Sequence, residues 1–187
     1  NNITGLYSHS FPEIPEGYDF DFINPDALLS EISVKDNKAV TRCGKEYQVI
    51  CLDGNCKKMS LEVLKKIALL ASRCVIICGQ IPSTAASMYD SSREFETIVK
   101  DIWFSGRANV FGGKWLEDVM PASRITPDWI ILNGSGIRVV HRKLSDGHIY
   151  WVNSPVSEPQ TAEISLRTHG LKPQKWDPMN GEVSDLS

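Results

Sequence analysis

Apolar and polar positions between residues 47 and 80 follow the pattern of a strand, a helix and a second strand. Residues 47–52 form a short apolar run with β-branched members, which favours a strand. Apolar residues then recur at helical spacing over 61–71, and Ser60 before them is of a type that caps helices. Residues 75–78 are apolar throughout, as a strand buried on both faces should be. Together these segments predict a right-handed βαβ unit with parallel strands.

Three further segments have the pattern of helices. Residues 24–26, Asn-Pro-Asp, make a strong helix start, because Asn caps, Pro fits the first helical position and Asp suits the positive end. Ser and Glu at 91 and 94 have capping-box spacing, and apolar residues recur along one face over 95–102. Residues 115–119 predict a last short helix, which Pro121 should end.

From Asp128 onward the pattern changes to strands alone. Residues 137–142 and 148–152 predict two strands, and the Asp-Gly pair at 146–147 between them is typical of a hairpin turn. Residues 162–167 alternate between apolar and polar, which predicts a half-exposed strand. We expect this strand to pair beside the hairpin.

The β-rich tail is too small to be stable alone, because two or three strands rarely form an independent domain. Its apolar faces must therefore pack against something else. Tyr150 and Trp151 are adjacent in a predicted strand and so face opposite sides. We expect one of them to be buried, within the tail or against the preceding part of the chain. The boundary between the two parts is expected near residues 121–128.

Composition and charge exclude some functions. The chain has 187 residues, a net charge of −3 and a pI near 5.8, which argues against a nucleic-acid-binding surface. No apolar run approaches the roughly 20 residues needed to span a bilayer. The sequence opens without a signal peptide or an initiator Met, so we expect a mature or excised piece of a longer protein.

Two motifs suggest chemistry but fit it poorly. Cys78 before Gly79 at a strand end resembles a nucleophile elbow, which needs small neighbours and a helix directly after it. Here Ile77 precedes, and Gln-Ile-Pro follows at 80–82, so we interpret all five cysteines as small hydrophobic residues without zinc-site spacing. The glycine-rich residues 133–136 precede a strand, whereas a phosphate site needs a helix there. We assign no catalytic residue, cofactor site or metal ligand.

Four polar side chains remain as candidate contacts. Asp19 and Asp21 stand two apart and would face the same way in an extended segment. They could bind a cation or sugar hydroxyls, or form a solvated acidic loop. His141 and Arg142 in a predicted strand could contact an anion or a sugar, or form the polar face of an antiparallel sheet.

The order of motifs resembles the region downstream of the catalytic barrel in bacterial α-L-rhamnosidases of glycoside hydrolase family 106. The resemblance runs over nearly the whole chain. Its most specific parts are the opening Gly-Tyr-Asp-Phe-Asp-Phe-Ile-Asn and the hairpin with His-Arg, Asp-Gly and Tyr-Trp-Val-Asn. The segments that carry it are 17–24, 47–52, 59–62, 79–83, 137–142, 149–153, Gly170, 176–178 and Gly181.

In that family a large barrel carries out inverting, calcium-assisted hydrolysis of terminal rhamnose, and α/β and β-sandwich parts follow it. The resemblance implies that this chain is the accessory part, with no catalytic residue or cofactor of its own, and that calcium belongs to the parent's barrel. Its partners would be the barrel and β-sandwich domains of a periplasmic or extracellular parent, and a plant or bacterial glycan. Possible sugar-cleft contacts are Tyr18, Asp19, Asp21, His141 and Arg142.

The expected fold class is α/β. Residues 1–127 should form a connecting loop and a flavodoxin-like or amidotransferase-like parallel sheet with flanking helices. Residues 128–187 should form a β-rich segment, the start of a β-sandwich. The first functional hypothesis is a non-catalytic fragment that supports the barrel and borders its sugar cleft. The alternatives are an amidotransferase-like or flavin-binding enzyme, favoured by a His and an acid beside Cys78, and a carbohydrate-binding module, favoured by a row of exposed aromatics.

Overall fold

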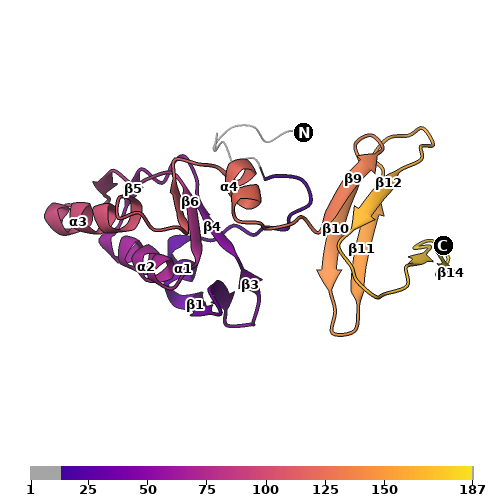
Figure 1. The fold of residues 1–187 in the computed structure, drawn as a ribbon, viewed down its shortest axis with the longest axis horizontal. Coiled ribbons are helices and arrows are strands. Elements are labelled where there is room, and N and C mark those ends of the chain that lie inside the picture. Colours follow the sequence, from indigo (N-terminus) through magenta and orange to yellow (C-terminus); the bar gives the residue numbers. More distant parts are fainter. Residues whose placement is uncertain (1–13, 187) are drawn as a thin grey trace. The chain divides into compact units, whose positions relative to one another are not determined.

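The computed structural model describes residues 14–186 (Figure 1). The chain divides into two compact units, which we describe separately. Within the described residues, the α/β unit comprises 14–15 and 20–126, and the β unit comprises 16–19 and 127–186. In the described part of the chain, no helix is both long and apolar enough to cross a membrane.

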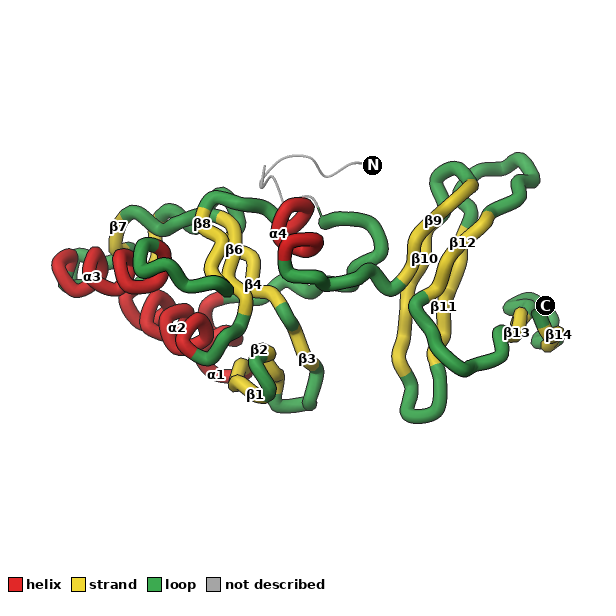
Figure 2. The backbone as a smooth tube through the Cα atoms, in the orientation of Figure 1, coloured by secondary structure: helices red, strands yellow, loops and turns green. Residues whose placement is uncertain are grey.

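The α/β unit mixes helices with short strands (Figure 2). Strands β4, β6 and β8 form one sheet, strands β1 to β3 form a second, antiparallel sheet, and β5 pairs with β7. In chain order its elements are α1 (Pro25–Glu31), β1 (Ile32–Lys35), β2 (Lys38–Thr41), β3 (Glu46–Tyr47), β4 (Val49–Leu52), β5 (Lys58–Met59), α2 (Leu61–Ser72), β6 (Ile76–Gly79), β7 (Thr84–Ala85), α3 (Ser92–Trp103), β8 (Val110–Gly112) and α4 (Leu116–Ala122).

The predicted helix starts are confirmed by side-chain caps. Asn24 accepts a hydrogen bond from the Ala27 N–H at 2.8 Å, and Ser60 and Ser91 cap α2 and α3 in the same way. The prediction that Pro121 ends the last helix is wrong by a small margin, since α4 continues to Ala122. Pro121 has no N–H to donate to the carbonyl four residues earlier, so α4 loses one hydrogen bond, while the Ser123 N–H still donates to the Val119 carbonyl and closes the last turn.

The predicted parallel sheet is confirmed. Strand β4 pairs in parallel with β6, and β6 pairs in parallel with β8. One face packs against α2 and α3 through side chains such as Leu64 and Ile77, both fully buried, while Cys78 contacts α4 on the other face. The spatial order of these described strands follows the chain order, and helices cover both faces of the sheet, as in an α/β architecture.

The β unit is built from three antiparallel strand pairs. Its core contains Trp129, Ile137 and Val139, with Ile131, Tyr150 and Ile164 packed against them. In chain order the elements are β9 (Trp129–Asn133), β10 (Arg138–Lys143), β11 (His148–Asn153), β12 (Glu163–Leu166), β13 (Gln174–Trp176) and β14 (Val183–Asp185).

The β unit confirms one expected strand pairing and corrects another. The hairpin β10–β11 forms as predicted. The prediction that the strand around Ile164 pairs beside this hairpin is wrong, because β12 pairs with β9 and sets Ile164 opposite Ile131. That register lets both apolar side chains join the core. Tyr150 is half-buried in this core, whereas Trp151 is 54% exposed, so the two do face opposite sides as expected.

Candidate functional site

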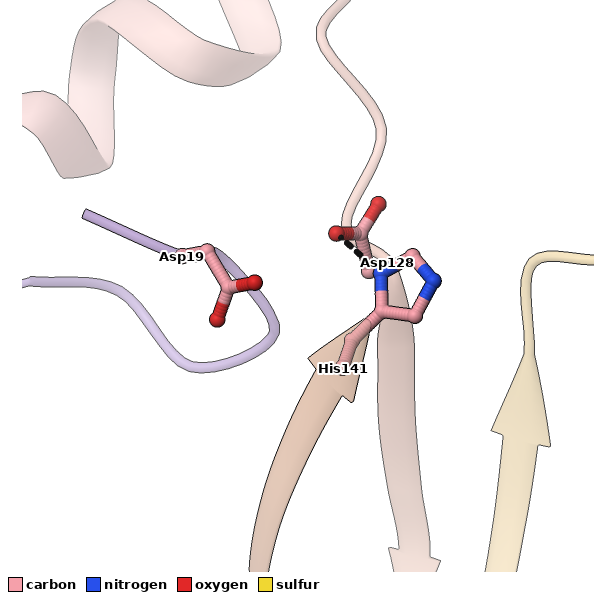
Figure 3. Close-up of side chains that lie close together, drawn as sticks. All are labelled: Asp19, Asp128 and His141. Atoms are coloured by element: carbon pink, nitrogen blue, oxygen red, sulfur yellow. Dashed lines mark hydrogen bonds and ion pairs between the residues drawn. The ribbon is translucent and has the colours of Figure 1, made fainter. Parts of the chain in front are cut away.

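A cluster of three polar side chains lies in the β unit. Asp19, Asp128 and His141 each place one potential ligand atom within 4.8 Å of the other two (Figure 3). Among the described residues, this is the one group of three or more His, Cys, Asp or Glu side chains close enough to share a metal ion. Asp19 is exposed, but the side chains of His141 and Asp128 are only 9% and 17% exposed.

Backbone contacts hold the short segment 16–19 beside the start of β9. The Asp128 N–H donates to the Gly17 carbonyl at 2.7 Å. Gly17 has φ +91°, and a Cβ on it would lie 2.3 Å from the Trp129 carbonyl oxygen. Only glycine allows this close approach in this backbone conformation. Asp19, two residues later, is thereby brought to Asp128, which is distant in the sequence.

The β10–β11 register places the imidazole of the cluster in a stack of rings. His141 lies opposite Tyr150, and their rings are parallel with centroids 4.4 Å apart. His148 comes from the next residue pair on the same face of the hairpin. Its Nδ1 lies 2.7 Å from Nε2 of His141. Nδ1 of His141 is 2.9 Å from Oδ2 of Asp128. Both ring nitrogens of His141 therefore have fixed partners.

Asp128 is held on its other side as well. The Arg167 guanidinium forms an ion pair with Oδ1 of Asp128, and the backbone N–H of Arg167 donates to the Asp128 carbonyl at 2.9 Å.

Two tyrosines near this cluster have shifted pKa values. Burial raises the pKa of the Tyr18 phenol above its usual value, with Arg167 acting in the opposite direction. Burial and the Asp128 carboxylate raise the pKa of Tyr150, whose hydroxyl donates to the Asp128 carbonyl at 3.4 Å. Both phenols therefore stay protonated near neutral pH.

Comparison with known protein families identifies the family of the chain. The sequence model described as alpha-L-rhamnosidase, glycoside hydrolase family 106, matches residues 1–187. The chain belongs to this rhamnosidase family. The family resemblance found in the motifs from residue 17 to Gly181 is thus confirmed.

A solved rhamnosidase supports the same assignment. The structure of a rhamnosidase from Novosphingobium sp. PP1Y superposes with a TM-score of 0.83 at 25% identity, over 92% of this chain. The matched region is only 18% of the Novosphingobium chain, so this family member corresponds to a small part of that protein. No curated protein sequence matches the chain.

The structure separates the predicted sugar-contact residues of this rhamnosidase-family chain. Tyr18, Asp19 and His141 lie in the β unit, close to Asp128. Asp21 belongs to the α/β unit, where it accepts hydrogen bonds at 2.5 Å from the side chains of Lys45 and Tyr47. Arg142 is exposed on β10, on the strand face opposite to that of its neighbour His141. Whether these residues contact a sugar stays a prediction.

Sequence reasoning missed three members of the network, Asp128, His148 and Arg167. One signal could have found His148. The predicted hairpin fixes which positions share a face, and that face carries His141, His148 and Tyr150 together. Asp128 and Arg167 are 39 positions apart in the sequence, and no local sequence pattern predicts their contact.

The cluster does not fit calcium. Calcium prefers about six to eight oxygen ligands, whereas the cluster offers one imidazole nitrogen and two carboxylates, one of them engaged by Arg167.

We expect the pair of Asp21 and Lys45 to make the stability of the α/β unit depend on acid. Hydrogen bonds from Lys45 and then Tyr47 lower the pKa of Asp21. A carboxyl whose pKa is lower in the folded state stabilises fully above its unfolded value, about 3.9, and this stability is lost as pH falls through the folded pKa. Asp21→Asn should therefore lower the melting temperature at pH 6 slightly and flatten its fall below about pH 4.

The size of this effect is limited by solvent, because half of the Asp21 side chain is exposed. We expect a loss below about 1 kcal/mol at pH 6. Glu96→Gln, at an exposed position on α3, is the control and should leave the melting curve unchanged at both pH values. Parallel pH profiles of Asp21→Asn and the unchanged chain would contradict the prediction.

Proposed function

We propose that this chain is a non-catalytic accessory part of an α-L-rhamnosidase and supports a catalytic barrel carried by the rest of a longer protein. One observation carries the proposal. The family match extends over all 187 residues, whereas the chain spans only 18% of the Novosphingobium rhamnosidase. The remaining length of such a protein leaves ample room for a barrel, and barrel enzymes of the β/α type supply their catalytic side chains from the strand ends.

The engagement of Asp128 supports an accessory role. The acid and the base of an inverting glycosidase must face the scissile bond of the sugar and its attacking water. Asp128 instead directs one oxygen to Arg167 and the other to His141, and it is largely buried. In this arrangement its carboxylate positions neighbouring side chains in the β unit.

The state of Cys78 argues against an amidotransferase-like enzyme. Cys78 is fully buried. A hydrogen bond with the Cys51 thiol and burial raise the pKa of Cys78 strongly. A catalytic cysteine needs the opposite shift, because the thiolate is the nucleophile. We therefore favour a structural role for Cys78 at the centre of the sheet.

The proposal also assigns a part to each of the two units and a location to the parent protein. The α/β unit is a flavodoxin-like module, the β unit is the start of a β-sandwich, and the parent works in the periplasm or outside the cell. The calcium of the reaction would be bound by the barrel. The module borders the sugar cleft, and the residues offered to the sugar are Tyr18, Asp19, Asp21, His141 and Arg142.

The purified 187-residue chain should not release the aryl alcohol from an aryl α-L-rhamnoside, because the catalytic groups would lie in the barrel. A chromogenic assay measures this directly, and the full-length Novosphingobium rhamnosidase serves as the positive control. Deleting the matched region from that protein should lower its soluble yield and melting temperature, because the surfaces that this region covers would become exposed to solvent. Turnover by the isolated chain that is abolished by Asp19→Asn would refute the accessory role.

A further inference from the structure

We propose that Asp19, Asp128 and His141 bind a divalent transition-metal ion of the Zn²⁺ class in the β unit. This inference goes beyond the accessory function, because it concerns a cation site with no part in rhamnoside hydrolysis. It rests on the convergence of three ligand atoms, on the groups behind them, and on the charge of the cluster.

The ligand atoms already lie near the spacing that zinc needs. Oδ2 of Asp128 and Nδ1 of His141 are 2.9 Å apart, and the Asp19 carboxylate reaches within 4.8 Å of both (Figure 3). With metal–ligand bonds of about 2.0–2.1 Å and tetrahedral angles, two ligand atoms lie roughly 3.3 Å apart. A shift of a few tenths of an ångström would open the His141–Asp128 contact for an ion.

The atoms behind the ligands are held as they are in metal sites. Metal-binding histidines use one ring nitrogen for the ion and donate from the other to a fixed acceptor, and ligating carboxylates are hydrogen-bonded in turn. Nε2 of His141 meets Nδ1 of His148 at 2.7 Å, and Oδ1 of Asp128 meets Arg167. Nδ1 of His141 and Oδ2 of Asp128 contact each other directly, and they are the two atoms between which an ion would lie.

The tautomer of His141 defines what can occupy that point. If Nε2–H donates to His148, Nδ1 presents a lone pair to a carboxylate oxygen at 2.9 Å. Two lone pairs at this distance repel each other unless a cation lies between them. In the other tautomer, Nδ1–H donates to Asp128 and Nε2 accepts from His148. A proton on Nδ1 and a metal ion are therefore the two occupants that the experiment distinguishes.

The ligand types and the charge select the class of ion. Imidazole with carboxylates suits zinc, nickel, copper and iron, whereas calcium and magnesium prefer oxygen alone. Two carboxylates beside the Arg167 guanidinium leave about one negative charge in the cluster, which attracts a divalent cation. Asp19 is exposed, so an ion has a route from solvent and room for bound water.

Calorimetric titration of Zn²⁺ into the full 187-residue chain, stripped beforehand with a chelator, tests the proposal. We expect saturable binding of one ion per chain. Asp19→Asn should weaken the affinity by about tenfold or more, in line with the effect of removing groups from metal sites. This variant should fold, because Asp19 is exposed. The matched control is Asp146→Asn at the exposed tip of the β10–β11 hairpin, which should bind as the unchanged chain does.

Cobalt distinguishes this cluster from the five cysteines. Co²⁺ on oxygen and nitrogen ligands gives weak visible bands, whereas thiolate ligands add an intense near-ultraviolet band. We expect the weak bands alone, lost in Asp19→Asn. The proposal is overturned by an absence of saturable binding, by equal affinity in Asp19→Asn, by thiolate bands, or by displacement of Zn²⁺ with equimolar Ca²⁺. Because every readout is binding, these outcomes do not depend on whether the chain hydrolyses a rhamnoside.

Discussion

Gly79→Ala should destabilise the α/β unit by about 3 kcal/mol or more. Gly79 ends β6 with φ +91°, and a Cβ on it would lie 2.0 Å from the Leu52 carbonyl oxygen of the neighbouring strand. The clashing atom belongs to the backbone of β4, so no side-chain rotation relieves it. Urea denaturation followed by far-ultraviolet circular dichroism measures this unit, because the described helices all lie in it.

Gly44→Ala is the matched control for this clash. Gly44 has φ +86°, close to that of Gly79, but nothing lies within 4 Å of its Cβ position. It should therefore show the conformational strain alone, about 1 kcal/mol. Equal losses in the two variants would mean that strain, and not the contact with Leu52, sets the requirement for glycine at the end of β6.

Phe95→Ala should destabilise the α/β unit by about 3–5 kcal/mol. Phe95 lies on α3, is only 2% exposed and is the largest of the fully buried side chains in the described part of the chain. Its removal leaves a cavity in the main apolar core of the unit, which the surrounding structure fills only in part. The same urea denaturation should show a lower midpoint without loss of helix signal in the absence of denaturant.

Phe104→Ala tests whether burial, and not aromatic content, produces this loss. Phe104 is the C-cap residue of α3 and is 70% exposed. Its truncation should change the stability by less than about 0.5 kcal/mol. A loss as large as that of Phe95→Ala would show that Phe104 is covered in solution, which would contradict its exposure in this structure.

The parts of the fold that sequence patterns predict are those whose determinants lie close together in the chain. Ser60 caps α2 through the N–H of Val63, three residues away, and Cys51 and Cys78 mark apolar runs that become neighbouring parallel strands. Pairing of β12 with β9 has no such local mark. It is decided by which partner lets Ile164 reach the core, a property of the assembled unit.

The candidate site shows the same limit. Asp19 and Asp21 are two residues apart, and extended geometry predicts that they act together. The structure separates them, because the boundary between the units falls between residues 19 and 20. Asp19 joins Asp128 and His141, whereas Asp21 joins Lys45. A periodic pattern gives side-chain direction within one element, but it does not reveal where the chain leaves one folded unit for another.

The assignment of residues 16–19 to the β unit has a consequence for how this module can be inherited or exchanged. Within the described residues the chain changes unit after Pro15, after Asp19 and after Thr126. A recombination that transferred the β unit as one block from Pro127 onward would leave Gly17 and Asp19 behind. The recipient would lack both the Gly17 carbonyl that accepts from the Asp128 N–H and the Asp19 carboxylate that lies beside Asp128 and His141. A transferred piece that keeps these contacts must therefore begin before residue 16.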